Sequence, residues 1–108
     1  MLKRLKFNDE TILNVFIADS FGKRLFGYMF RNKPHHNAIL IKPCNSIHTF
    51  FMKFSIDVLF LDEHMQVIKK IKSLRKGQVI TKVMGAKMVI EAKAGVLNKF
   101  EVGDMFKI

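Results

Sequence analysis

The sequence is poor in several residue types that would otherwise define its class. Its 108 residues include one cysteine, two prolines, no tryptophan and only 9 acidic residues against 19 lysines and arginines. A single cysteine excludes an internal disulfide framework. With 49% hydrophobic and 26% charged residues, the composition also excludes a disordered chain and a collagen-like repeat. We therefore expect one globular domain over residues 1–108.

Long apolar runs are missing as well. The best run, residues 58–61, is bounded by Asp57 and Asp62 and falls far short of the ~20 residues that a membrane-spanning helix needs. The basic start, residues 1–7, is followed at once by polar residues 8–10, so the apolar core of a signal peptide is absent. The sequence predicts no transmembrane segment and a cytoplasmic location.

Short β-rich runs separated by turn residues make up most of the chain. Asp19 and Ser20 offer an N-cap for one helix over residues 21–30, and residues 95–100 suit a single helical turn. The sequence predicts a mainly β fold, a small closed or partly closed barrel-like sheet with one short α-helix. The first two expected strands form a hairpin, and the full set covers residues 2–7, 12–18, 38–41, 49–52, 58–61, 67–71, 79–83, 88–91 and 105–108.

Reactive side chains are densest in residues 43–53. Strand alternation there places His48 in line with Phe50 and Met52, and a partly buried imidazole needs a hydrogen-bond partner. Asp57 and Asp62 flank an apolar strand, where a carboxylate either caps a turn or faces inward as a partner. We expect His48, Asp57 and Asp62 to come close together.

This cluster predicts a pocket for an unknown small molecule, polar or anionic in character. A buried polar network that only fixes the fold accounts for the same residues equally well. The candidate ligand-binding residues are His48, Thr49, Asp57, Asp62, Arg31, Lys53, Cys44 and Arg24.

The same segment resembles a known family. Its central motif is carried by Pro43-Cys44, Ser46 to Thr49, Phe51-Met52, Ile56 to Val58 and Phe60 to Asp62. These residues resemble the central motif of the prokaryotic uncharacterised ACR family, which is the domain of unknown function numbered one hundred and ninety-two. Residues 24–31 are similar to its first motif, and residues 91–95 with 102–104 to its last. Ser55, Phe51 and Lys76 depart from the usual pattern. The resemblance implies a mainly β fold and a shared polar site, but no reaction.

Metal binding and nucleophilic catalysis are two more specific functions that the residue types of this segment could serve. Cys44 and His48 form one pair with the spacing of metal ligands, which His35, His36 or Asp57 could supplement. A zinc site requires more ligands than one such pair. We therefore predict no metal and no other cofactor. Cys44, His48 and Asp57 also have the residue types of a thiol–imidazole–carboxylate relay, with Thr49 or Ser46 as hydroxyl variants. Residue types alone leave enzymatic activity open.

A basic run provides the alternative function. The basic residues Lys69, Lys70, Lys72, Arg75 and Lys76 lie close together without an acid among them. Such a patch can contact the phosphates of nucleic acid or an anionic membrane. Both halves of the chain carry net positive charge, however, and no nucleic-acid-binding signature is present. A solvated lysine-rich face is the default interpretation, and a nucleic-acid partner is the alternative to a small molecule.

Overall fold

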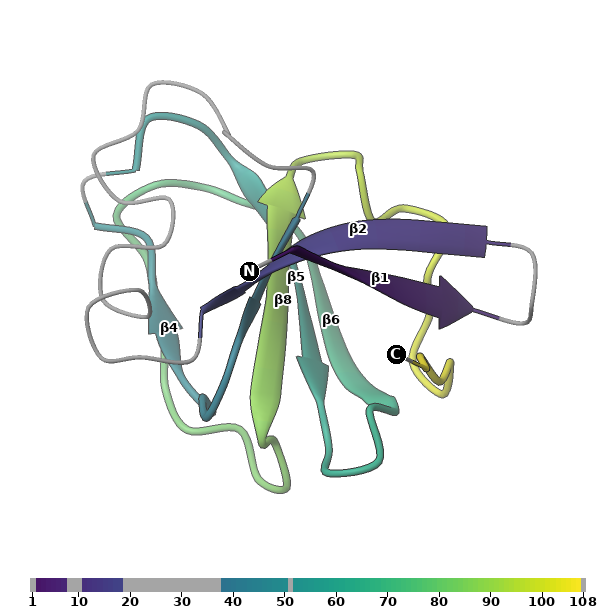
Figure 1. Ribbon diagram of the computed structural model, residues 1–108. Helices are drawn as coiled ribbons and strands as arrows, with labels where there is room; N and C mark the ends of the chain where they lie inside the picture. Colours follow the sequence, from purple (N-terminus) through teal and green to yellow (C-terminus); the bar gives the residue numbers. More distant parts are fainter. Residues whose placement is uncertain (1, 8–10, 19–37, 51, 108) are drawn as a thin grey trace.

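The computed structural model of the chain describes residues 2–7, 11–18, 38–50 and 52–107 (Figure 1). Nearly all of its regular structure is β-strand. The strands are β1 (Leu2–Phe7), β2 (Thr11–Ala18), β3 (Ala38–Ile41), β4 (Ile47–His48), β5 (Ile56–Leu61), β6 (Val67–Leu74), β7 (Val79–Ile80) and β8 (Met88–Lys93).

Six of these strands form one sheet in the order β1-β2-β3-β8-β5-β6. β2 and β3 are parallel, and the other neighbours are antiparallel. The sheet curls into a half-barrel in which the β1–β2 hairpin crosses over the central strands (Figure 1). β4 and β7 pair with each other in a separate two-stranded sheet. The expected mainly β fold, its partly closed sheet and the opening hairpin are confirmed.

The expected helical elements have different outcomes. The helix predicted over residues 21–30 lies outside the described residues, and within the described ranges the structure contains no helix. Residues 95–100 were expected to form a helical turn. They form consecutive tight turns instead, in which Val96 donates to the Lys93 carbonyl and Phe100 donates to the Leu97 carbonyl.

The predicted strand over residues 49–52 is wrong, because β4 ends at His48. The Met52 amide donates to the Thr49 carbonyl over 3.2 Å, which closes a turn where the alternation predicted extended chain. β7 likewise covers only Val79–Ile80 of the expected 79–83. At the C-terminus, Met105 and Lys107 each form an isolated bridge rather than a strand.

The central strands β5 and β8 are buried on both faces of the sheet. On one, the C-terminal face, β5 and β8 side chains pack under Leu97, Phe100 and Phe106 from the last part of the chain. On the other face they pack with Ile47 and Met52 from the segment around β4, and we call this face the lobe face. These two faces separate the polar residues that the sequence analysis grouped together.

No described segment is a helix long and apolar enough to cross a membrane.

Candidate functional site

Two stretches of chain form a small unit at the side of the main sheet, which we call the lobe (Figure 1). The first stretch comprises residues 42–50 and 52–54, and the second comprises residues 75–87. Antiparallel backbone hydrogen bonds join the two stretches along their length. Cys44 donates to the Lys87 carbonyl at one end, Val83 donates to Asn45 next, and β4 pairs with β7. The lobe is therefore a defined platform built on the central sequence motif.

Thr49 fastens the far end of the lobe. Its hydroxyl donates to the Arg75 carbonyl over 2.7 Å and accepts from the Gln78 amide over 2.8 Å. Its backbone amide donates to the Gln78 carbonyl, and its carbonyl accepts from the Gly77 amide. Thr49 is buried, with 1% of its surface exposed. One residue thus fixes the whole turn of residues 75–78.

Replacing Thr49 by valine tests this role, because valine keeps the shape and removes the hydroxyl. The Arg75 carbonyl and the Gln78 amide then lose their side-chain partner, which costs about 1–2 kcal/mol of unfolding free energy. We expect amide hydrogen exchange at Gln78 to accelerate in the variant. Thr81→Val, at an exposed position of the same lobe, is the control. Equal exchange at Gln78 in both variants would contradict the role of Thr49.

His48 and Phe50 flank Thr49 and form a stacked ring pair at the surface. Their centroids lie 5.2 Å apart with 28° between the planes, and the Phe50 amide donates to His48 Nδ1. Phe50 is 44% exposed, and Val79, which pairs with His48 across the β4–β7 ladder, is 54% exposed. The expected line of His48, Phe50 and Met52 holds only in part, because His48 stacks on Phe50 whereas Met52 is buried in the core. Phe50 is thus the exposed member of the pair, and His48 is half-buried.

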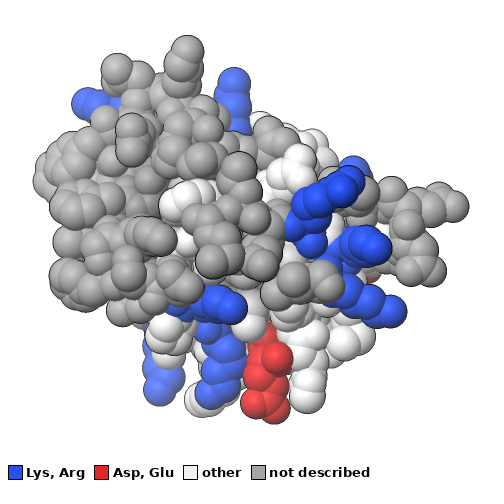
Figure 2. Space-filling view, in the orientation of Figure 1, with Lys and Arg blue, Asp and Glu red and all other residues white. Residues whose placement is uncertain are grey.

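The lobe carries positive charge and no acid. The sequence has no Asp or Glu between Asp19 and Asp57, or between Glu63 and Glu91. Cations elsewhere on the visible face are scattered over several places (Figure 2), so net charge alone does not locate a site. The lobe cations are Lys42, Lys53, Arg75, Lys76, Lys82 and Lys87, all of them exposed except the half-buried Lys42.

Asp57 is fully buried and holds backbone amides. Its Oδ1 accepts from the Ser73 amide over 2.9 Å, and its Oδ2 accepts from the Gly95 and Leu97 amides over 2.8 and 3.1 Å. Ser73 sits at the bulge of β6, with a φ of 53°. Asp57 therefore ties that bulge and the turns after β8 to the centre of the sheet, on the C-terminal face.

Asp62 caps a turn just beyond the opposite end of β5. Its Oδ1 accepts from the His64 and Gln66 amides over 2.9 and 3.0 Å. Four strand residues, 58–61, lie between Asp57 and Asp62, which in extended chain amounts to about 16 Å between the two Cα atoms. The expected cluster of His48, Asp57 and Asp62 is therefore not formed. The two aspartates take the two structural roles that the sequence allowed for them, an inward partner and a turn cap.

Cys44 does not meet Asp57 either. Its thiol donates to the Ser46 carbonyl over 3.1 Å, and its side chain packs on the lobe face, opposite Asp57. The thiol–imidazole–carboxylate relay is thus not assembled. Among the residues that the structure describes, no three His, Cys, Asp or Glu side chains gather as metal ligands.

The basic run along β6 is divided between the two faces of the sheet. Lys69 lies opposite Phe60 and Lys70 opposite Leu59, so their side chains leave on different sides. The Lys70 ammonium donates to the Asn98 and Phe100 carbonyls over 2.9 and 2.7 Å, and lies 3.6 Å from Glu101. Lys70 is a structural cation. Arg24, Arg31, His35 and His36 lie outside the described residues.

The family follows from comparison of the whole sequence. The model of DUF192, described as Uncharacterized ACR, matches residues 3–108. The chain belongs to this family. A UPF0127 protein from Pyrococcus abyssi is 44% identical, over 83% of this chain and 81% of the relative. A UPF0127 protein from Pyrococcus horikoshii is 39% identical, over 86% and 85%. The resemblance seen in the motifs is confirmed.

Two solved structures share the fold of this DUF192 chain. A protein of unknown function from Novosphingobium aromaticivorans superposes with a TM-score of 0.83 at 12% identity, over 99% of this chain and 85% of that one. A Sinorhizobium meliloti protein described as a candidate transcription regulator superposes with a TM-score of 0.80 at 17% identity, over 96% and 89%. At these identities the likeness shows the fold alone.

Glu91, which the sequence analysis treated only as part of a family motif, is the least expected polar residue of this DUF192 chain. It lies in β8 on the lobe face, between Ile39 and Val58 of the neighbouring strands, and is 2% exposed. Its Oε1 has no hydrogen-bond partner within the described part of the chain. Burial raises the pKa of Glu91 from 4.5 to about 7. The signal in the sequence was a single acid at the end of the apolar residues 88–90, in the strand expected over residues 88–91.

Proposed function

We propose that the protein binds a small anionic ligand at one end of the lobe, in what we call the Thr49 site: His48, Thr49, Phe50, Arg75 and Lys76. One observation carries the proposal. Thr49 bonds the backbone of the cation-bearing turn directly to the segment that presents His48 and Phe50. The turn is thus ordered before any ligand arrives, which lowers the entropic cost of binding.

The chemistry of the site favours phosphate or carboxylate groups. Arg75 offers a planar guanidinium that can grip two oxygens at once, and Lys76 adds a compact charge. Both side chains are exposed. His48 accepts the Phe50 amide at Nδ1, so in the neutral ring the proton lies on Nε2, available as a donor. No acid in the lobe competes for these groups.

The remaining sequence candidates fall into two sets. Lys53, in the same acid-free lobe, and Arg24 and Arg31, outside the described residues, stay candidates for the ligand. Cys44, Asp57 and Asp62 are left out of the proposed site. Asp57 and Asp62 are acids outside the lobe, and Cys44 lies at the opposite end of the lobe from Thr49, beside Lys87. A cytoplasmic location is also part of the proposal, supported by the single cysteine.

Binding of inorganic pyrophosphate, measured by isothermal titration calorimetry, tests the proposal. We expect Arg75→Gln together with Lys76→Gln to weaken binding about tenfold or more, since two charge-assisted contacts are lost. Higher salt should weaken binding to the wild type, because the site is exposed and therefore screened.

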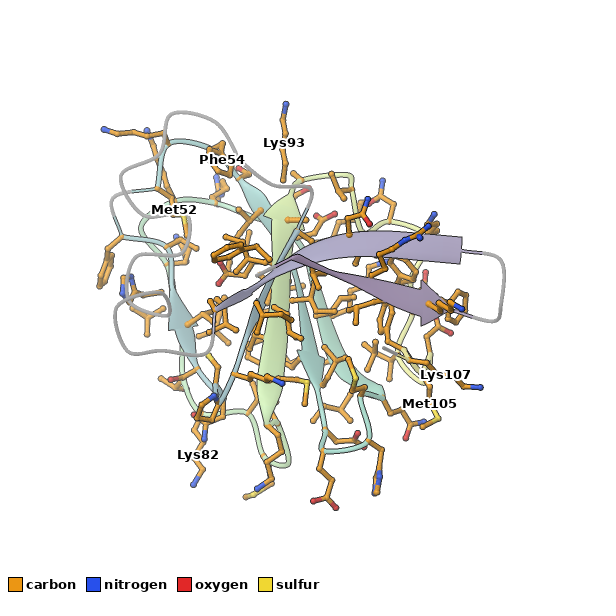
Figure 3. All side chains as sticks on the ribbon, in the orientation of Figure 1. Met52, Phe54, Lys82, Lys93, Met105 and Lys107 are labelled. Atoms are coloured by element: carbon orange, nitrogen blue, oxygen red, sulfur yellow. The ribbon has the colours of Figure 1, made fainter. Side chains whose placement is uncertain are left out.

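The control is Lys82→Gln together with Lys87→Gln, which removes the same charge from the same lobe. Figure 3 shows Lys82 at the opposite end of the lobe from Met52, whose amide donates to Thr49. We expect the control pair to change the affinity less than threefold, because exposed charges outside the site contribute little to binding. An equal loss in both double variants, or no binding to the wild type, would contradict the proposal.

A further inference from the structure

We infer that the ligand of the Thr49 site is a nucleotide, with its base on the His48–Phe50 ring pair and its phosphate on the turn of residues 75–78. This inference rests on the proposed function and adds to it a ligand class. It follows from the exposed Phe50 ring, which anion binding alone does not need.

The ring pair has the features of a stacking platform. His48 and Phe50 lie nearly parallel, 5.2 Å apart, and Phe50 is 44% exposed. Val79 stands directly across the β4–β7 ladder from His48 and is 54% exposed, so an apolar edge continues beside the rings. An aromatic side chain of this kind stacks on any base, because every base has a π-face.

The platform and the cations occur in one rigid piece. Thr49 lies between His48 and Phe50 in the chain and bonds to Arg75 and Gln78 on the other stretch. A ligand that touches both parts must therefore combine a flat, uncharged group with an anion nearby. A nucleotide presents this combination in one small molecule, since a ribose joins its flat base to its phosphate. Free nucleotides and single-stranded nucleic acids share this chemistry.

Binding of four probes at about 0.15 M salt separates the contributions: inorganic pyrophosphate, ribose 5-phosphate, adenosine monophosphate and a single-stranded adenylate hexamer. We expect adenosine monophosphate to bind about fivefold or more tightly than ribose 5-phosphate, the low end of what one stacked base contributes. A hexamer that binds at least tenfold tighter still identifies single-stranded nucleic acid as the source. A hexamer no tighter than the monophosphate identifies the free nucleotide.

Phe50→Leu removes the ring and keeps an apolar side chain, and Phe50→Tyr keeps the ring as the matched control. Because Phe50 is at the surface, both variants are expected to fold. In the leucine variant, adenosine monophosphate should bind no better than ribose 5-phosphate. The tyrosine variant should retain the preference for the base.

Two outcomes would overturn the inference: equal affinity of the wild type for adenosine monophosphate and ribose 5-phosphate, or a preference for the base that survives Phe50→Leu. A failure of the proposed function looks different, since in that case pyrophosphate and ribose 5-phosphate do not bind to the wild type at all. Loss of pyrophosphate binding in Phe50→Leu would also overturn the inference, because the ring would then support the turn and not the base.

Discussion

Replacing Asp57 by alanine is expected to lower the free energy of unfolding by roughly 3–5 kcal/mol, because three backbone amides lose their acceptor in one step. The amides of Ser73, Gly95 and Leu97 all donate to this buried carboxylate. Leu97 is itself buried in the core of the C-terminal face, so the variant loosens the packing there as well. Domains of this kind have a total stability of only about 5–15 kcal/mol.

Asp104→Ala is the matched control for Asp57. Asp104 accepts one backbone amide, that of Glu101, over 2.8 Å and is half-buried. We expect this variant to cost about 1 kcal/mol. Urea unfolding followed by circular dichroism suits both variants, since the chain has no tryptophan. If Asp57→Ala costs no more than Asp104→Ala, the bonds of Asp57 do not hold the C-terminal segment to the sheet.

Replacing Glu91 by glutamine is expected to stabilise the protein increasingly as the pH rises. Burial raises the pKa of the Glu91 carboxyl from 4.5 to about 7 in the folded state. Between these two values the folded state binds more protons than the unfolded state, so the stability of the wild type falls with rising pH. Over this window the loss amounts to about 3 kcal/mol. Glutamine cannot ionise and avoids that loss.

The measurement is the difference in unfolding free energy between Glu91→Gln and the wild type at several pH values from 4 to 8. We expect the difference to change in favour of the variant between about pH 4.5 and 7 and to be constant above. Glu63→Gln is the control, because it makes the same chemical change at an exposed position. A difference that stays constant across the whole range would contradict the account of Glu91.

Most of the main sheet could be predicted from the sequence because its strands are marked by composition. β3 and β5 are apolar runs between turn residues, and the first two strands are separated by polar residues 8–10. The lobe could not be predicted in the same way. Residues 49–52 alternate like a strand, but the backbone groups of Thr49 form hydrogen bonds with the turn of residues 75–78 and with Met52. Residues 75–78 are too far from Thr49 in the sequence to leave a local signal.

The candidate site was predicted in part for a similar reason. His48 and Thr49 were identified from the density of polar residues in one segment, and both belong to the proposed site. Arg75 was assigned to a different patch, since nothing in the spacing shows that its carbonyl meets Thr49. Asp57 and Asp62 were grouped with His48 by proximity along the chain. The β5 residues between them, 58–61, keep the two aspartates apart.

The central claim is that an anion binds where Thr49 joins the two stretches of the lobe. The most direct test is a titration of the ¹⁵N-labelled protein with pyrophosphate, followed by the amide chemical shifts of every residue. We predict that the largest changes fall on residues 48–50 and 75–78, and that the amides of β6 around Lys69 and Lys72 change little. Changes spread evenly over the surface cations, or centred on β6, would contradict the claim.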